Sequence, residues 1–185
     1  MRSIEMGWKS TTLPGVQVYE PAVYGDERGF FMETFRSAWF EELGLDGTFV
    51  QDNFSRSVRG VLRGLHYQVV APQGKLVRAV HGEIFDVAVD LRRTSPTFGK
   101  WVGVTLSADN KQALWIPPGF GHGFYTLSEV AEVMYKCTTY YAPEHDRSLR
   151  WDDPAIGITW PLSAPVQVSS KDAQAPLLCD AELFG

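Results

Sequence analysis

The chain has 185 residues, the length of about one domain. With 44% hydrophobic and 13% aromatic residues it can bury a core, and 21% charged residues is typical of soluble globular proteins. Its formal net charge of −5 argues against general nucleic-acid or membrane-surface binding. An anionic ligand therefore requires a local cluster of Arg and Lys.

Targeting signals and membrane spans are not expected. No apolar run approaches the roughly 18–20 residues of a membrane-spanning helix, and the N-terminal "MRSIEMGWKS" lacks the apolar stretch of a signal peptide. Cys137 and Cys179 have neither disulfide-framework nor metal-site spacing, which favours two free thiols in a reducing compartment. We expect a cytoplasmic protein that binds neither nucleic acid nor membrane.

Taken in chain order, the expected elements are mostly short β-strands separated by turn residues. One helix is predicted, in "SAWFEELG" (37–44), with Ser37 as its N-cap and Gly44 at its exit. The strand-like runs are "GVQVYEP" (15–21), "TFVQDN" (48–53), "GVLRGLHYQ" (60–68), "KLVRAV" (75–80), "EIFDVAVDLR" (83–92), "WVGVTLS" (101–107), "QALWIP" (112–117), "HGFYTLS" (122–128) and "AEVMYKCTTYY" (131–141). Many short strands and little helix predict an all-β sandwich or barrel.

The run 83–92 shows the period of two most clearly. Phe85, Val87, Val89 and Leu91 fall on one face, and Asp86, Ala88 and Asp90 fall on the other.

The run "GVLRGLHYQ" carries residues that a strand needing only to pack does not require. Strict alternation would put Arg63 and His66 on opposite faces. Gly60 and Gly64 permit a bulge or a close backbone approach that brings both to one side. The alternative is a buried His66 with a satisfied ring and a solvated Arg63.

Six blocks of sequence resemble the dTDP-4-dehydrorhamnose 3,5-epimerase family. They are "GDERGFFMETF", "FVQDNFSRSVRGVLRGLHYQ", "QGKLVRAVHGEIFDVAVDLRRTSPTFGKW", "WIPPGFGHGF", "YKCTTYYAPE" and "SSKD", which run from about Gly25 to Asp172. The resemblance implies a cupin-type jelly roll over residues 1–185 as a single epimerase domain. It also implies a homodimer without metal or organic cofactor, an N-terminal segment exchanged with the partner, and a C-terminal segment near the site.

The resemblance implies that the substrate is dTDP-4-dehydro-6-deoxy-glucose, inverted at C3 and C5. Both carbons adjoin the C4 ketone, so loss of either proton gives an enolate, and catalysis needs a base, an acid on the opposite face and oxyanion stabilisation. His66 resembles the family's base and Asp172 its carboxylate partner, while Tyr135 matches the acid. Lys75 matches the cation beside the C4 oxygen.

The remaining matches are binding groups. Arg28 and Glu33 lie in the N-terminal block that, in the family, reaches into the neighbouring subunit's site. Residues matched to the base, sugar or diphosphate are Gln51, Asp52, Asn53, Arg63, His122, Tyr141, Asp146 and Lys171. Arg and Lys suit phosphate oxygens, and Tyr141 corresponds to the ring that stacks on thymine.

A metal site is disfavoured, although cupins often bind transition metals. The usual His-x-His of the first motif is His66-Tyr67-Gln68 here, and only the second motif, ending at His122, is retained.

Two positions depart from the family pattern. Phe54 stands where histidine is common in the family and Asp146 where glutamate is common. Neither is the proposed base, acid or carboxylate partner, so the reaction type is unaffected, and the consequence for pocket shape stays open. Three functions stay open: the double epimerase of rhamnose-precursor synthesis, a mono-epimerase of C3 or C5 in an antibiotic-sugar pathway, and a non-catalytic jelly roll that binds a nucleotide sugar.

Overall fold

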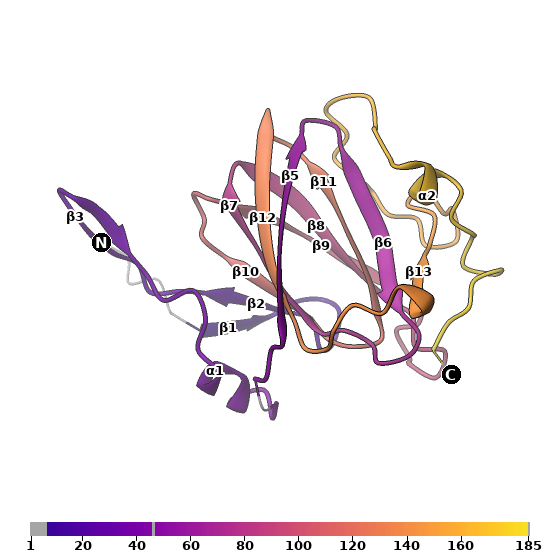
Figure 1. Cartoon of the computed structure of the whole chain (residues 1–185), viewed down its shortest axis with the longest axis horizontal. Helices are drawn as coiled ribbons and strands as arrows, with labels where there is room; N and C mark the ends of the chain where they lie inside the picture. The colour runs from indigo at the N-terminus through magenta and orange to yellow at the C-terminus, as the bar shows by residue number, and fades with distance from the viewer. Residues whose placement is uncertain (1–6, 46, 185) are drawn as a thin grey trace.

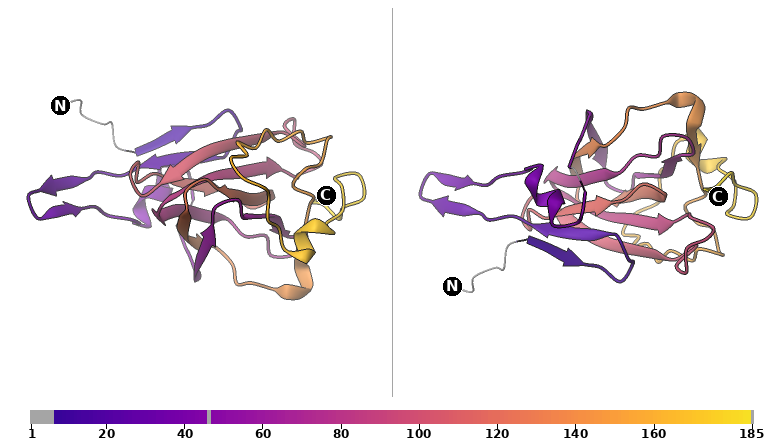
Figure 2. Two further views of the ribbon diagram at one scale, coloured as in Figure 1. Left: turned by 90° about the horizontal axis from the view of Figure 1, so that it is seen from above. Right: turned by 90° about the horizontal axis from the view of Figure 1, so that it is seen from below.

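The computed structural model describes residues 7–45 and 47–184. Two antiparallel β-sheets face each other, and a two-stranded hairpin projects from the N-terminal side (Figure 1). Figure 2 shows the same projection from two further sides. The all-β jelly-roll sandwich with short helices confirms the fold predicted from the sequence.

The first sheet has six strands in the order β1-β2-β10-β7-β12-β5. These strands are β1 (Gly7–Ser10), β2 (Gln17–Glu20), β5 (Gln51–Val58), β7 (Lys75–His81), β10 (Ala113–Ile116) and β12 (Val130–Cys137). The sheet is continuous because each strand pairs with its neighbours, as β12 does at Tyr135 with Val77 on β7 and Asn53 on β5, although the β12–β7 register shifts between Glu132 and Val133.

The second sheet has five strands in the order β13-β6-β11-β8-β9. They are β6 (Leu62–Gln68), β8 (Glu83–Asp90), β9 (Trp101–Ser107), β11 (Phe120–Thr126) and β13 (Asp146–Ser148). Each predicted strand-like run overlaps a strand. Four short strands were not predicted, because segments of three or four residues carry too little alternation: β1, β13 and the projecting hairpin of β3 (Tyr24–Asp26) and β4 (Gly29–Phe31).

The alternation predicted for β8 is confirmed, and both of its faces are buried. Val87, Val89 and Leu91 pack in a cluster that includes residues of the C-terminal segment. Ile84 and Ala88 belong to a second cluster, which also contains Val77 and Val133 of the facing sheet. By the same alternation, the face of β8 that carries Asp86 and Asp90 is directed between the sheets.

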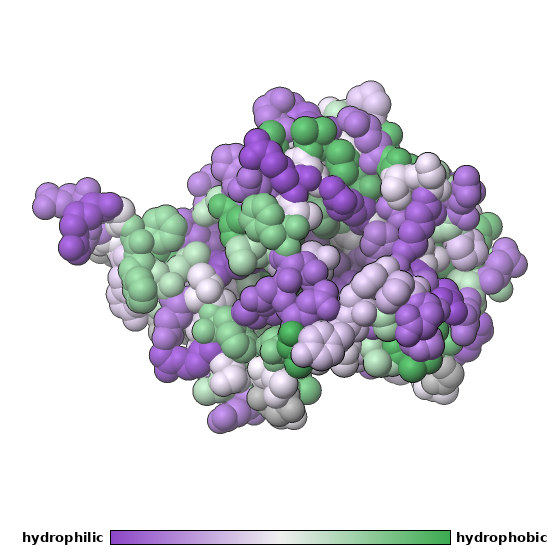
Figure 3. Space-filling model, in the orientation of Figure 1, coloured by the Kyte–Doolittle hydropathy of each residue, from purple (hydrophilic) through white to green (hydrophobic). Residues whose placement is uncertain are grey.

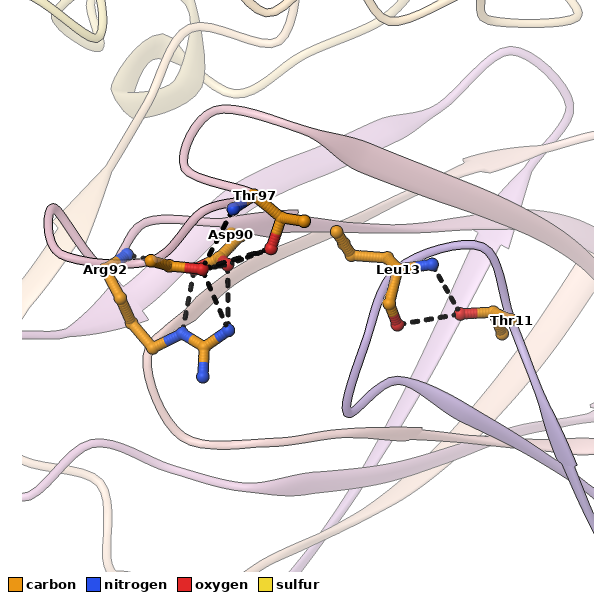
Figure 4. Close-up of polar contacts among 6 residues, drawn as sticks. Thr11, Leu13, Asp90, Arg92 and Thr97 are labelled. Atoms are coloured by element: carbon orange, nitrogen blue, oxygen red, sulfur yellow. Dashed lines mark hydrogen bonds and ion pairs between the residues drawn. The ribbon is translucent and has the colours of Figure 1, made fainter.

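Asp90 is fully buried, and surrounding donors satisfy its charge (Figure 4). Its carboxylate accepts hydrogen bonds from the Arg92 guanidinium at 2.8 and 2.9 Å, from Ser95 Oγ at 2.5 Å and from Thr97 Oγ1 at 2.7 Å. Burial acts to raise the pKa of Asp90, but these hydrogen bonds hold it far below its usual range. This carboxylate shapes the loop after β8.

The helices are short: α1 (Ala38–Glu41), the 3-10 turn η1 (Pro143–His145) and α2 (Ser170–Ala173). The predicted helix exists, Ser37 occupies its N-cap position as predicted, and Gly44 follows its end with φ of 72°. Ser37 has helical backbone angles, however, φ −56° and ψ −38°, and its side chain makes no capping hydrogen bond. No helix within the described ranges is long and apolar enough to span a membrane.

Candidate active site

A β-bulge in β6 brings Arg63 and His66 to the same face. On β11, His122 pairs with His66 and Phe124 pairs with Arg63, so two steps along β11 match three along β6. The extra residue falls at Gly64, whose φ is +121° and where an added Cβ would lie 2.5 Å from Gly123 Cα. The two side chains therefore share a face, although Arg63 is exposed to solvent as the alternative expected, and His66 is half-buried.

His66 is backed by a buried carboxylate. Its Nε2 lies 2.6 Å from Oδ1 of Asp172, which α2 places over β6. Ser169 caps α2, because its Oγ accepts a hydrogen bond from the Asp172 amide at 3.1 Å. An ionised carboxylate only accepts hydrogen bonds, so Nε2 carries the proton and Nδ1 is the nitrogen left to act as a base.

Burial raises the pKa of Asp172, but its surroundings more than reverse this. The hydrogen bond and charge of His66 lower the pKa most, followed by hydrogen bonding from Ser169 and from the Gly64 amide, and the net pKa lies below its ordinary value. Asp172 thus stays ionised at neutral pH and holds the His66 ring by its Nε2.

His66 and Tyr135 line the same cavity, of about 340 Å³. The lining residues are Gln51, Asn53, His66, Tyr67, Gln68, Gln73, Lys75, Tyr135, Tyr141, Asp146 and Lys171. A larger cavity of about 410 Å³ is also present and shares Tyr135, but neither His66 nor Lys75 lines it. We assign the chemistry to the smaller one, because an acid, a base and a cation converge there.

Tyr135 and Lys75 form the floor of this cavity on the six-stranded sheet. Burial raises the pKa of Tyr135, so its phenol is a protonated acid near neutral pH. Lys75 is only 9% exposed. Within residues 7–45 and 47–184, its ammonium makes no hydrogen bond or ion pair, so it is available to a developing oxyanion.

The cavity rim is a hydrogen-bonded set of predicted binding residues. Gln51 accepts from the Tyr141 amide at 2.8 Å and donates to Asn53 Oδ1 at 3.0 Å. Asp146 accepts from the Tyr141 hydroxyl at 3.1 Å and forms an ion pair with Lys171. The structure therefore brings together five of the predicted binding residues around the mouth of the cavity.

Other predicted residues lie outside the cavity lining. Arg63 donates to Ser57 Oγ at 3.0 Å, and its charge partly offsets the rise in the pKa of Tyr135 that burial causes. His122 is buried behind the lining, with its Nε2 2.8 Å from Asp86 Oδ1. Burial is the main reason that the pKa of His122 lies below its ordinary value.

Asp52 and the N-terminal residues do not reach this cavity within one chain. Asp52 lies on the other face of β5, where it pairs with Lys136 at 2.9 Å. Arg28, on the projecting hairpin, donates hydrogen bonds to Asp26. Glu33, which follows the hairpin, forms an ion pair with Arg36.

The departure at Phe54 leaves the lining unchanged. Phe54 follows Asn53 on β5, so it faces away from the cavity, and it is 59% exposed. Phe54 therefore does not line this cavity. Asp146, in contrast, does line the cavity.

Three residues at or behind the cavity were not predicted from the sequence as site residues: Gln68, Gln73 and the buried Asp86. Gln68 donates to the Tyr140 carbonyl at 3.3 Å and accepts from the Ala142 amide at 2.8 Å, so it anchors the rim loop. The signal for Asp86 was present, since an acidic residue with apolar neighbours two positions away on a strand face is unusual in a core.

Comparison with known proteins agrees with this geometry. The family model of dTDP-4-dehydrorhamnose 3,5-epimerase matches residues 10–180. The chain belongs to this family. A family member from Pseudomonas aeruginosa is 58% identical over 173 residues, which cover 93% of this chain and 96% of that protein. One from Neisseria gonorrhoeae is 59% identical over 172 residues, but the chain spans only 52% of its length.

Solved structures of epimerases share the fold. The epimerase from Legionella pneumophila, in complex with dTDP-4-keto-L-rhamnose, has 55% identity and a TM-score of 0.93, covering 96% of this chain and 95% of that one. A 3'-monoepimerase from Streptomyces bikiniensis, in complex with dTDP-quinovose, has 36% identity and a TM-score of 0.87, covering 91% and 86%.

Proposed function

We propose that the chain epimerises dTDP-4-dehydro-6-deoxy-D-glucose at C3 and C5 to give dTDP-4-dehydro-L-rhamnose, a step in dTDP-L-rhamnose biosynthesis. The observation that carries the proposal is the convergence of Asp172-backed His66, Tyr135 and Lys75 at one cavity. Membership of the epimerase family supports the same reaction.

Each inversion is a proton removal followed by a proton return. Nδ1 of His66 takes the proton from the carbon next to the C4 ketone, and the C–H electron pair moves into an enolate. Lys75 faces the oxygen on which negative charge develops. The Tyr135 hydroxyl then protonates the same carbon from the opposite face, which reverses its configuration, and solvent restores both proton carriers.

The nucleotide is held at the rim. Lys171 and Arg63 supply positive charge for the diphosphate, and Tyr141 offers a half-exposed ring on which thymine stacks. Asp146 already pairs with Lys171, so we expect the diphosphate to compete with this carboxylate for the ammonium.

We also propose that residues 1–185 act as one epimerase domain in a homodimer, with the N-terminal segment reaching the partner's site. The projecting hairpin supports this, because Phe30 and Phe31 are 59% and 67% exposed on it. Its tip is hydrophilic, and hydrophobic residues gather between the tip and the body of the molecule (Figure 3). Exposed apolar surface of this kind marks an interaction site. Sedimentation of the full chain tests the dimer.

Incubation with the substrate in heavy water, followed by NMR, tests the reaction. The double epimerase is expected to introduce deuterium at both C3 and C5 and to give the L-rhamno product. Deuterium at one carbon alone would identify a mono-epimerase, which the likeness to a 3'-monoepimerase keeps as the second candidate. Ligand binding without exchange would identify a non-catalytic nucleotide-sugar protein.

A further inference from the structure

Asp86 is a buried carboxylate with half of its hydrogen-bonding capacity unused. It is fully buried on β8, and Oδ1 accepts from His122 Nε2 at 2.8 Å. Its second oxygen, Oδ2, has no partner in the described part of the chain. Asp90 on the same strand face is instead surrounded by side-chain donors. A buried anion this poorly satisfied requires a compensating positive charge.

Lys75 is the matching buried cation. It makes no hydrogen bond or ion pair within the described ranges, and it lies two residues before Val77 on the same face of β7. Val77 packs in one cluster with Ile84 and Ala88, which flank Asp86 on its face of β8. The two unsatisfied groups therefore belong to strand faces that pack against each other between the sheets.

Other groups that face Lys75 are less able to balance its charge. Burial lowers the pKa of Lys75, while Cys137, then Asp146 and then Asp86 act to raise it. Burial also raises the pKa of the Cys137 thiol, which is therefore neutral near pH 7, and Asp146 already pairs with Lys171. The remaining titratable groups near this floor are His66, Tyr135 and His122.

We propose that Asp86 is a positioning residue for the reaction: it is the buried counter-charge that keeps Lys75 cationic at the cavity floor, and it fixes the His122 ring with its proton on Nε2. The catalytic consequence rests on the proposed function, in which Lys75 stabilises the enolate. The charge pairing of Asp86 with Lys75 does not depend on the proposed function.

The reason is electrostatic. An ammonium enclosed by protein tends to lose its proton, and a neutral amine cannot offset the charge of an enolate oxygen. A carboxylate nearby in a medium of low polarity favours the ammonium without occupying the position that the enolate oxygen needs. Asp86 therefore stabilises the Lys75 ammonium from the side away from the cavity, and the cavity side of Lys75 stays free for the enolate oxygen.

A double-mutant cycle in thermal unfolding tests the charge pairing without substrate. The variants are Asp86→Asn, which keeps the shape and an acceptor for His122, Lys75→Met, and the two combined. Each single change is expected to lower Tm, and the double variant is expected to be more stable than the sum of the two losses by about 3 °C or more. Additive losses would overturn the proposal.

A pH series keeps the test decisive if Asp86→Asn does not fold. In Lys75→Met the unpaired carboxylate, with His122 beside it, takes up a proton more readily than in the wild-type protein. The Tm deficit of Lys75→Met should therefore shrink as the pH falls from 7 to 5. A deficit that stays constant would contradict the pairing.

The catalytic arm compares pH profiles of kcat. Asp86→Asn is expected to move the alkaline limb to lower pH by about one unit, because the Lys75 ammonium deprotonates earlier. Asp180→Asn, which removes an equal charge from an exposed position, is the matched control and should leave the limb in place. If the double-mutant cycle shows coupling but the alkaline limb of the kcat profile does not move in Asp86→Asn, the catalytic role of Asp86 is overturned. If the wild-type protein exchanges no deuterium, the proposed function fails while the cycle still decides the pairing.

Discussion

Two histidine–aspartate pairs lie side by side in this molecule and differ in their access to the cavity. His66 and Asp172 join β6 to α2, and the His66 side chain is 34% exposed. His122 and Asp86 join β11 to β8, and both side chains are almost fully buried. His66 and His122 are register partners on neighbouring strands. In the roles proposed above, the same pair of functional groups serves as a base where it meets the cavity and as an internal charge support where it does not.

Replacing the exposed histidine should have the largest effect on turnover. His66→Ala removes the base and is expected to lower kcat by about 10³–10⁴-fold, with deuterium exchange lost at both carbons. His81→Ala, an exposed histidine at the end of β7, is the control and should retain activity. Turnover of His66→Ala within tenfold of the wild-type value would remove this residue from the mechanism.

Replacing the buried histidine should instead reduce stability. His122→Ala leaves Asp86 buried without its hydrogen bond, so we expect a loss of about 3 kcal/mol in the free energy of unfolding. Denaturant unfolding of His122→Ala and His66→Ala in parallel measures the contrast. Equal losses in the free energy of unfolding would contradict the different roles given to His122 and His66.

The buried pair also predicts a pH dependence of stability. The pKa of His122 is depressed in the folded protein, mainly by burial, so between its folded pKa and about 6.5 the unfolded chain binds more protons. This contribution to stability is present above about pH 6.5 and is lost as the pH falls towards the folded pKa. Melting curves at pH 5–8 should show a smaller slope in His122→Ala than in the wild-type protein.

Mutation should separate the role of Tyr135, the proposed acid, from that of His66, the proposed base. Tyr135→Phe is expected to lower the rate of product formation by about 10²-fold, because it removes the hydroxyl group that lines the cavity with His66 and returns the proton in the proposed reaction. Since His66 still removes protons, substrate recovered from heavy water should contain deuterium without inversion. Inverted product at the wild-type rate would exclude Tyr135 as the acid.

Features that depend on residues close together in the sequence could be predicted, whereas features that depend on the pairing of distant strands could not. Local alternation predicted β8, and the glycines of "GVLRGLHYQ" predicted that Arg63 and His66 could share a face. The burial of Asp86 against His122 could not be predicted from either strand alone, because it is created by the pairing of β11 with β8. The outward direction of Asp52 and Phe54 likewise follows from the register of β5 with β12.

The N-terminal hairpin should contribute to binding rather than to chemistry. If Arg28 reaches a partner's site, Arg28→Ala should raise KM about tenfold with little change in kcat, the loss expected for one charge-assisted contact to phosphate. Arg93→Ala, exposed on the loop after β8, provides a control of equal charge. Unaltered KM for Arg28→Ala would contradict the cross-subunit assignment.

The smallest effect is expected where the chain departs from its family. Phe54→His restores the residue common in the family, but Phe54 faces away from the cavity that holds both His66 and Tyr135. We therefore expect kcat and KM each to stay within about twofold of the wild-type values, since surface substitutions usually change energies by less than about 0.5 kcal/mol. The exposed ring lies opposite Met134 on the same outer face. A larger change in kcat would mean that the two faces of β5 are coupled.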